Sequence, residues 1–240
     1  MKWIFSMVLM MSVSAFADIC GKDDRTESFD PRVGRLVSEG NTQGCTVALV
    51  GESCVVTAGN CVTHDYVEFN VPQSVAGIPQ AASLQDRYMV DKTFMRYSVE
   101  GIGQQWAVIK LAANELTGTH AGKNQGFFKI AAKKAPKDTI IKVISFGHVA
   151  NRDDADILNF AQQSSQGLLS KGVLFMPAII EHSADTSSGS LGAPIINANS
   201  GEILGVNTHG GCQGNYSNNS GTSISGNKKF AKAINECLAR

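Results

Sequence analysis

The chain has 240 residues, of which 43% are hydrophobic and 18% are charged. This composition excludes an intrinsically disordered protein, and the length allows one large domain or two small ones. The 21 basic and 21 acidic residues balance each other, so the charge favours neither nucleic acid nor a membrane as a partner.

The first 17 residues are typical of a secretory signal peptide. Lys2 supplies a positive charge, residues 3–13 are apolar except for two serines, and the Ala-Phe-Ala sequence at 15–17 resembles a cleavage site. The apolar run is shorter than the ~20 residues that span a bilayer. We therefore predict cleavage before Asp18 and a secreted or periplasmic protein without a membrane anchor.

From residue 33 onward, short β-like runs alternate with turns. The chain has 24 glycines, and clusters of Asn, Asp and Ser separate the runs, which is typical of a β-sandwich or barrel. The predicted strands are Cys45–Val50, Cys54–Thr57, Tyr66–Val71, Ala107–Leu111, Thr139–Ser145, Val173–Ile180, Ala193–Ile196 and Ile203–Thr208.

Two segments differ from this pattern. Residues 114–126 are polar and contain glycine, so we interpret them as the connector between two halves. Near the end of the chain, Phe230, Ala233, Ile234 and Cys237 recur at helical spacing after Asn227. This spacing predicts a C-terminal amphipathic helix at 227–238.

Six cysteines follow the predicted signal peptide. In an exported protein they are expected to form disulfides, and six cysteines allow many pairings. A zinc site is the alternative, but the chain has no Cys-x-x-Cys pair and its five histidines are scattered. We therefore predict no metal and no cofactor. The cysteines are Cys20, Cys45, Cys54, Cys61, Cys212 and Cys237.

Three motifs, taken together and in order, carry a resemblance to a known family. They are TAGNC at 57–61, which follows a strand that opens with Cys45, then QWAVIKL at 105–111 and GSLGAP at 189–194. With these motifs the chain resembles the chymotrypsin/trypsin-like serine proteases, particularly their bacterial glutamyl-endopeptidase-like branch. The segments GVNTHGG at 205–211 and NSGT at 219–222 extend the resemblance.

The resemblance implies an all-β fold of two six-stranded antiparallel β-barrels, with a cleft between them and a C-terminal α-helix. The domain organisation is then a signal peptide at 1–17, an N-terminal extension at 18–32, a first β-barrel at 33–118, a second β-barrel at 119–226 and the helix at 227–240. Closed barrels leave few free strand edges, which suits an exported protein.

The resemblance places the family's catalytic triad at Asn60, Gln105 and Leu191. Peptide hydrolysis in this family needs a histidine base, an aspartate that orients the histidine, and a serine nucleophile. An asparagine amide does not accept a proton near neutral pH, glutamine is uncharged, and leucine has no nucleophilic atom. We therefore expect a catalytically inactive homologue, a monomer that acts by binding an unidentified protein or peptide.

Other site positions follow from the same motifs. The backbone N–H groups of Gly189 and Leu191 stand where the family has its oxyanion hole, and Asp185, Asn207 and Thr208 stand at the specificity pocket. Asp185 is either a selector for basic side chains or a buried structural carboxylate. Asn207 replaces the histidine that selects acidic side chains in the glutamyl-endopeptidase-like branch.

Two other functions compete with this one. In the first, the chain is an active serine endopeptidase whose nucleophile has moved to Ser190, although His64 and His182 both lack the spacing of a base that faces it. We expect the strained turn to aim Ser190 away from the cleft. In the second, the chain is a structural or adhesive envelope protein without a ligand in the cleft.

The resemblance also implies a disulfide pairing. One pair matches the family bridge beneath the loop that carries the histidine. In this fold the strand that begins with Cys54 lies near the terminal helix, which favours a bond between Cys54 and Cys237. The two remaining cysteines then form the third pair. The implied bridges are Cys45–Cys61, Cys54–Cys237 and Cys20–Cys212.

Overall fold

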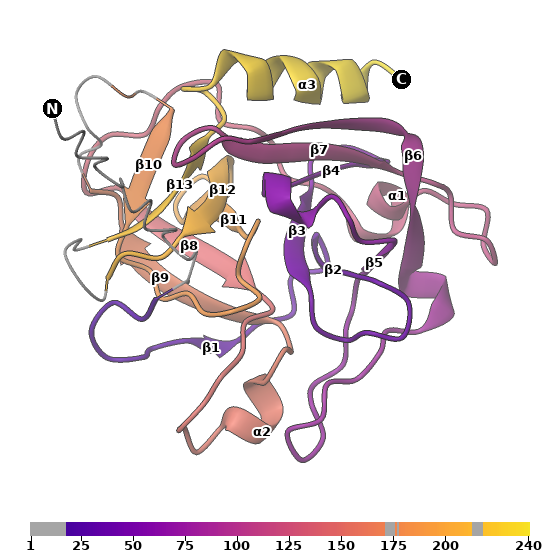
Figure 1. The fold of residues 1–240 in the computed structure, drawn as a ribbon, viewed down its shortest axis with the longest axis horizontal. Helices are drawn as coiled ribbons and strands as arrows, with labels where there is room; N and C mark the ends of the chain where they lie inside the picture. Colours follow the sequence, from indigo (N-terminus) through magenta and orange to yellow (C-terminus); the bar gives the residue numbers. More distant parts are fainter. Residues whose placement is uncertain (1–17, 171–175, 177, 213–217) are drawn as a thin grey trace, which may run out of the picture.

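The computed structural model describes residues 18–170, 176, 178–212 and 218–240. The predicted signal peptide at 1–17 lies outside the described residues. Two β structures lie side by side, and one longer helix crosses them at the top (Figure 1). The elements are β1 (Thr26–Glu27), β2 (Val33–Val37), β3 (Cys45–Leu49), β4 (Cys54–Thr57), η1 (Gly59–Cys61), β5 (Tyr66–Glu68), η2 (Leu84–Asp86), β6 (Arg87–Val99), β7 (Gln105–Leu111), α1 (Ala121–Gln125), β8 (Ile140–Ser145), α2 (Ala155–Leu158), β9 (Gln163–Leu168), β10 (Ile179–His182), β11 (Pro194–Asn197), β12 (Ile203–His209), β13 (Asn219–Ser223) and α3 (Lys228–Leu238).

The first half is a closed six-stranded antiparallel barrel, as predicted. Its strands follow the order β2-β3-β4-β7-β6-β5, and pairing of β2 with β5 closes the ring. Apolar side chains that alternate along the strands fill the interior, so each strand contributes to one buried cluster. Its members include Leu36, Val47, Val55, Val67, Tyr88 and Ile109.

The second half is a seven-stranded antiparallel sheet in the order β1-β9-β8-β11-β12-β13-β10. The extra strand is β1, which comes from the N-terminal extension and pairs with β9. At the other end of the sheet, β10 curves back towards β9, where Leu169 pairs with His182. The Ser170 N–H donates to the Glu181 carbonyl at 2.9 Å in the same place. The all-β fold is therefore confirmed, but the expected second six-stranded barrel is a sheet with a seventh strand.

Several strands differ from the predicted runs. The polar segment at 114–126 contains the short helix α1, and β6, β9 and β13 lie where no strand is predicted. Most of the predicted Val173–Ile180 strand falls outside the described residues, and β10 begins at Ile179. The remaining predicted runs overlap β3, β4, β5, β7, β8, β11 and β12.

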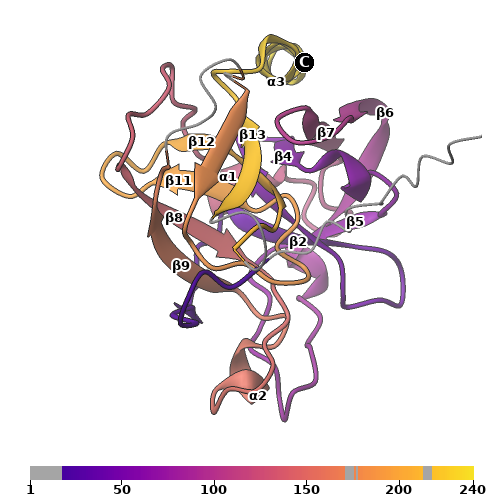
Figure 2. The same ribbon diagram turned by 60° about the vertical axis from the view of Figure 1, so that its left-hand side comes forward.

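The terminal helix α3 is present and uses the predicted face. Asn227 caps it, since the Asn227 side chain accepts a hydrogen bond from the Phe230 N–H at 3.1 Å. Phe230 is fully buried and stacks on Trp106 of β7, with the ring centroids 5.2 Å apart. Figure 2 shows α3 above β7 of the first half and β13 of the second.

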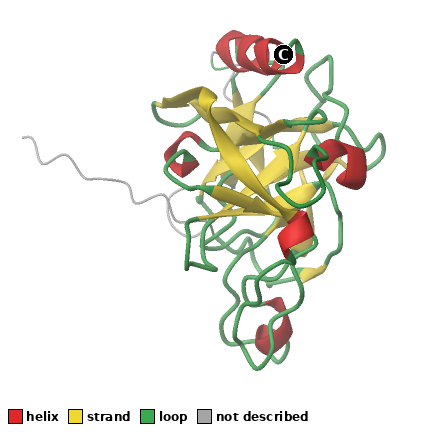
Figure 3. Cartoon of the chain, turned by 90° about the vertical axis from the view of Figure 1, so that its right-hand side faces the viewer, coloured by secondary structure: helices red, strands yellow, loops and turns green. Residues whose placement is uncertain are grey.

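The two halves share one hydrophobic core. A buried cluster contains Val56 and Val108 of the first half, Ile144 and Val206 of the second, and Phe230 of α3. The strands occupy the centre of the molecule, and the helical segments lie at its periphery (Figure 3). Because apolar side chains of both halves pack together, the halves are held in a defined relative position at their junction.

The structure contains three disulfides, in the pairing that the resemblance implies. Among the described residues no cysteine is free, and no helix has the length and apolar character needed to cross a membrane. Three disulfides fit an extracellular or periplasmic protein, since such bonds persist in oxidising compartments. The bonds are Cys20–Cys212, Cys45–Cys61 and Cys54–Cys237.

Candidate functional site

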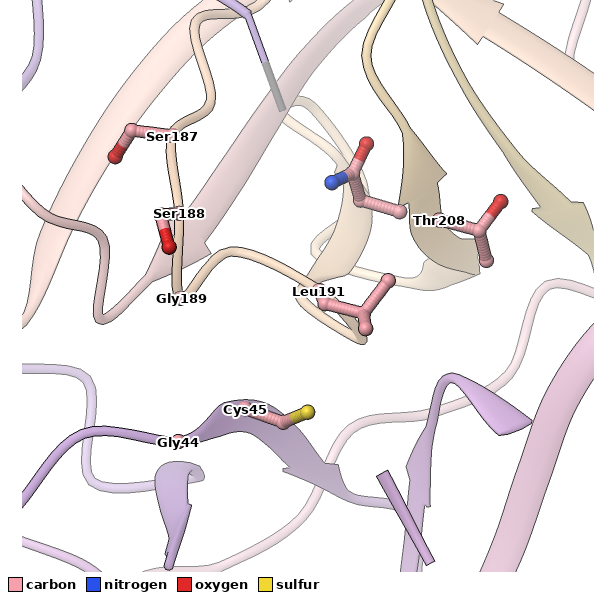
Figure 4. Close-up of a pocket in the computed structure, with 8 residues that line it drawn as sticks. Gly44, Cys45, Ser187, Ser188, Gly189, Leu191 and Thr208 are labelled. Atoms are coloured by element: carbon pink, nitrogen blue, oxygen red, sulfur yellow. The ribbon is translucent and has the colours of Figure 1, made fainter. Parts of the chain in front are cut away.

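A pocket of about 210 Å³ lies between the two halves, where the cleft is expected. Figure 4 shows Ser187, Ser188 and Gly189 along one side, with Gly44 and Cys45 on the opposite side. None of the residues that line this pocket carries a charge, so its walls offer hydroxyl groups, an amide, backbone groups and one leucine. The lining residues are Gly44, Cys45, Ser187, Ser188, Gly189, Leu191, Asn207 and Thr208.

The turn at 187–193 requires glycine at two positions. Gly189 has φ +99° and Gly192 has φ +84°, a region that other residues rarely adopt. A Cβ atom at Gly189 would overlap the carbonyl oxygen of Phe146. At Gly192 it would overlap the side chain of Thr57. The turn therefore fits closely against both halves.

Thr46, which is buried in β3, joins this turn to the first half. Its N–H donates to the Leu191 carbonyl at 2.9 Å, and its hydroxyl donates to the Gly189 carbonyl at 2.9 Å. The same hydroxyl accepts a hydrogen bond from the Phe146 N–H at 3.1 Å. The backbone and side chain of one residue thus fix the turn relative to the first barrel, a role that the sequence motifs do not indicate.

Asn60 and Gln105 come from adjacent segments of the first barrel. Asn60 lies in η1, directly after β4, and is exposed. Gln105 begins β7 and is 3% exposed. Pairing of Thr57 in β4 with Ala107 in β7 brings the two segments together. The Oε1 atom of Gln105 has no hydrogen-bond partner in the described part of the chain.

Leu191 and Ser190 point to different surroundings. Leu191 lines the pocket and packs against the first-half cluster that contains Cys45 and Cys61. The Ser190 side chain is fully buried, donates to the Ser145 hydroxyl at 2.9 Å and accepts from a backbone N–H. The turn therefore presents Leu191 to the pocket, whereas the Ser190 hydroxyl is bonded inside the second half.

Asp185 binds the N-terminal segment and does not line the pocket. Its carboxylate accepts from the Cys20 N–H at 2.6 Å and from the Asp24 N–H at 2.9 Å. Asp18 lies beside it, because the Asp18 carbonyl accepts from the Thr186 N–H at 3.1 Å. Asp185 is 3% exposed, and burial raises the pKa of its carboxyl. These contacts favour a structural role for Asp185 over a role as the selector for basic side chains.

His182 holds the pocket residue Asn207 from behind. The Nε2 atom of His182 lies 3.2 Å from the Asn207 Oδ1, and the Asn207 Nδ2 donates to the Ser190 carbonyl at 3.1 Å. Thr208, the next lining residue, has its hydroxyl 3.3 Å from the Ser220 carbonyl. Sequence reasoning missed this function of His182, because no motif marks a buried histidine in β10 that reaches across β13 to Asn207 in β12.

The buried His182 makes the stability of the fold depend on pH. Burial lowers its pKa from 6.5 to about 4, so the unfolded chain binds this proton at a higher pH than the folded chain. His182 should therefore contribute no pH dependence to the free energy of unfolding above about pH 7, and its contribution should lower this free energy by about 3 kcal/mol as the pH drops from about 6.5 to 4. Urea unfolding across this range measures the effect. The His182→Gln variant keeps a hydrogen-bonding side chain and should show a weaker pH dependence, whereas an unchanged dependence would contradict the prediction.

Comparison with known proteins gives a family and a shared fold. A family model described as Trypsin matches residues 18–232. A solved structure of a Glu endopeptidase in complex with MPD has a TM-score of 0.70 and 18% identity, and the match covers 92% of this chain and 100% of that chain.

Two further protease structures are similar over most of their length. A thermostable serine protease, AL20, from an extremophilic microorganism has a TM-score of 0.64 and 15% identity, with 88% of this chain and 98% of that chain covered. The protease Anisep from Arthrobacter nicotinovorans has a TM-score of 0.66 and 15% identity, with 90% and 100% covered. No curated protein matches the chain. At these identities the structures show a common fold.

Proposed function

Because this chain belongs to the trypsin family of serine proteases, we propose that it is an exported, non-hydrolytic member that binds a protein or peptide between its two halves. The observation that carries the proposal is the set of residues at the triad positions, namely Asn60, Gln105 and Leu191. The frame around them is complete, with a pocket between the halves and a turn that keeps its two strained glycines.

None of the three side chains can perform its step of peptide hydrolysis. The Leu191 side chain lines the pocket where the family has a serine hydroxyl, so position 191 offers no atom that could attack a carbonyl carbon. Asn60 cannot accept the proton, and the uncharged Gln105 cannot stabilise an imidazolium. In a serine protease of unrelated fold, loss of the nucleophile or the base alone costs on the order of 10⁶ in rate.

Other residues near the pocket are poorly placed to replace the triad. The Ser190 hydroxyl is bonded to Ser145 in the interior. His182 is buried against Asn207, and His64 lies in the first half with its Nδ1 3.1 Å from the Ser38 hydroxyl. Since no histidine is hydrogen-bonded to the Ser190 hydroxyl in the described part of the chain, these placements support binding without hydrolysis over an endopeptidase with a displaced nucleophile.

A fluorophosphonate probe tests the absence of a nucleophile. We expect the mature protein to gain no mass after incubation with the probe and to cleave no member of a broad fluorogenic peptide library. An active protease of the family serves as the positive control. Labelling that the Ser190→Ala variant abolishes would contradict the proposal and establish the displaced nucleophile.

The binding half of the proposal is tested by filling the pocket. Leu191→Trp is expected to abolish capture of a partner by the immobilised mature protein. Leu116→Trp, at a site that is 68% exposed and outside the pocket lining, is the matched control and should leave capture unchanged. Capture that both variants retain would favour a structural or adhesive function without a ligand in the cleft.

A further inference from the structure

Two backbone N–H groups in the pocket have no acceptor. In the turn at 187–193, the N–H groups of Ser190 and Gly192 donate to backbone carbonyls. No group among the described residues accepts a hydrogen bond from Gly189 or Leu191, and both of these residues line the pocket. The N–H of Ser188 also lacks an acceptor, but Ser188 is exposed to solvent.

The carbonyls of the same peptide groups fix the direction of these two N–H groups. Every described peptide bond is trans, so each N–H points opposite to the carbonyl of its own peptide group. The carbonyl before Gly189 accepts from the His148 N–H at 2.6 Å. The carbonyl before Leu191 accepts from the Ala193 N–H and from the Asn207 side chain, each at 3.1 Å. Both carbonyls are therefore held by the protein, and the two N–H groups face the pocket.

The pair is also fixed from the first barrel. Thr46 binds the carbonyls of both Gly189 and Leu191 at 2.9 Å, so the flanking peptide groups cannot rotate without breaking these bonds. The positive φ of Gly189 depends on the absence of a side chain. The two donors are therefore preorganised, and little conformational entropy is lost when an acceptor binds.

An anionic oxygen suits this pair best. Hydrogen bonds to a charged acceptor are about twice as strong as bonds between neutral groups, and successive backbone N–H groups form concave sites for anions. No acidic side chain lines the pocket, so nothing there repels a negative charge. A carboxylate has two oxygens and can offer one to each N–H.

The position of Leu191 determines where a bound peptide must end. Its side chain lines the pocket and packs against the first-half cluster that contains Cys45 and Cys61. In Figure 4 Leu191 lies between the wall at Gly189 and the residue Thr208. Leu191 thus takes up space that a peptide continuing past the two N–H groups towards Cys45 would need. We infer that the pocket binds the free carboxylate at the C-terminus of a peptide.

This inference rests on the proposed non-hydrolytic binding function and adds the group that the pocket recognises. Its test uses short N-acetylated peptides that differ in their last residue, each prepared as the free acid and as the C-terminal amide. The free acid of the best peptide should bind about tenfold or more tightly than its amide. It should also shift the amide signals of Gly189 and Leu191 in a ¹⁵N-labelled sample. Acetate, as a carboxylate without a peptide, should compete only at far higher concentration.

A pair of glycine variants separates the N–H pair from general effects on the fold. Gly189→Ala is expected to lower the affinity for the free acid about tenfold, because the peptide group before it must rotate. Gly201 has a comparable φ of +71°, but a Cβ atom there would meet open space, so Gly201→Ala should not change binding.

If Gly189→Ala does not fold, the comparison of acid and amide peptides on the parent protein still tests the inference. Equal affinity for acid and amide would overturn the inference and leave peptide binding intact, and failure of every free acid to bind would also overturn it. The capture experiment with Leu191→Trp tests the proposed function separately.

Discussion

Replacing Asn60 with His, Gln105 with Asp and Leu191 with Ser in one variant is expected to create peptidase activity about 10³-fold or more above the parent. The triad in a serine protease contributes on the order of 10⁶, and the lower value allows for imperfect alignment of the new side chains. Hydrolysis of fluorogenic peptides by the variant and by the parent measures the gain.

The structure gives a physical reason for this gain. Among the described residues, the buried Oε1 of Gln105 has no partner, so a carboxylate at 105 is expected to be free to accept the N–H of an imidazole introduced at position 60. The turn already presents residue 191 to the pocket, and the N–H groups of Gly189 and Leu191 are available to stabilise a developing oxyanion. If Asn60, Gln105 and Leu191 hold the triad positions as we propose, the three substitutions would restore the reacting side chains to surroundings that are already in place.

A matched control isolates the nucleophile. The variant with His at 60, Asp at 105 and Ala at 191 has the same two neighbours but no hydroxyl, and it should remain inactive. If the variant with Ser at 191 is folded, with the same circular dichroism as the parent, and is still inactive, the pocket itself has lost the geometry for hydrolysis. That result would contradict the prediction while agreeing with a binding function.

Removal of the Cys54–Cys237 disulfide is expected to lower the free energy of unfolding by about 5 kcal/mol. The bond joins residues 183 positions apart. Without it the unfolded chain gains conformational entropy, which lowers the free energy of unfolding. It also releases the covalent attachment of α3, whose residue Phe230 covers Trp106. Urea unfolding of the variant with alanine at both positions measures the loss.

The Cys45–Cys61 disulfide provides the comparison for this prediction. It joins residues only 16 positions apart, so the same chain-entropy argument gives about 3 kcal/mol for the corresponding double-alanine variant. Both bonds are buried and both variants leave small cavities, so the difference between them reports the loop length together with the release of α3. An equal loss in the two variants would contradict the loop-entropy explanation.

The sequence is informative where apolar residues or turn residues form a clear pattern. The strand β3 and the helix α3 follow from such patterns, and so does the position of the glycine turn around Leu191. The strand β13 does not, because its sequence NSGTS is polar and yet every residue in it is buried. Its polar groups are satisfied by distant partners, such as the Thr222 hydroxyl, which donates to the Gln105 carbonyl at 2.7 Å. Similarly, only three of the 13 residues of β6 are buried and charged residues interrupt its apolar ones, so it lacks the apolar run of a core strand.

The candidate site divides in the same way. Asn60, Gln105 and Leu191 could each be located from the sequence, because each lies in a short local motif. The expectation that they share one site comes from the family resemblance. The contacts of Thr46 with the turn and of His182 with Asn207 join residues that are far apart in the chain, and one sequence contains no record of those contacts. The N-terminal contacts of Asp185 were missed for this reason, although a structural carboxylate was one of the two alternatives.

The attachment of the N-terminal segment has a consequence for the order in which the molecule forms. Cys20 is bonded to Cys212, 192 positions later in the chain. Because a chain is synthesised from its N-terminus at about 5–20 residues per second, Cys20 emerges roughly 10–40 s before its partner. During that interval its thiol can meet Cys45, Cys54 and Cys61, and any wrong bond that forms must be exchanged before the native one can form. The contacts of Asp185 and Thr186 with the N-terminal segment are thus completed late, and a thiol–disulfide isomerase is expected to accelerate formation of the disulfide that secures them.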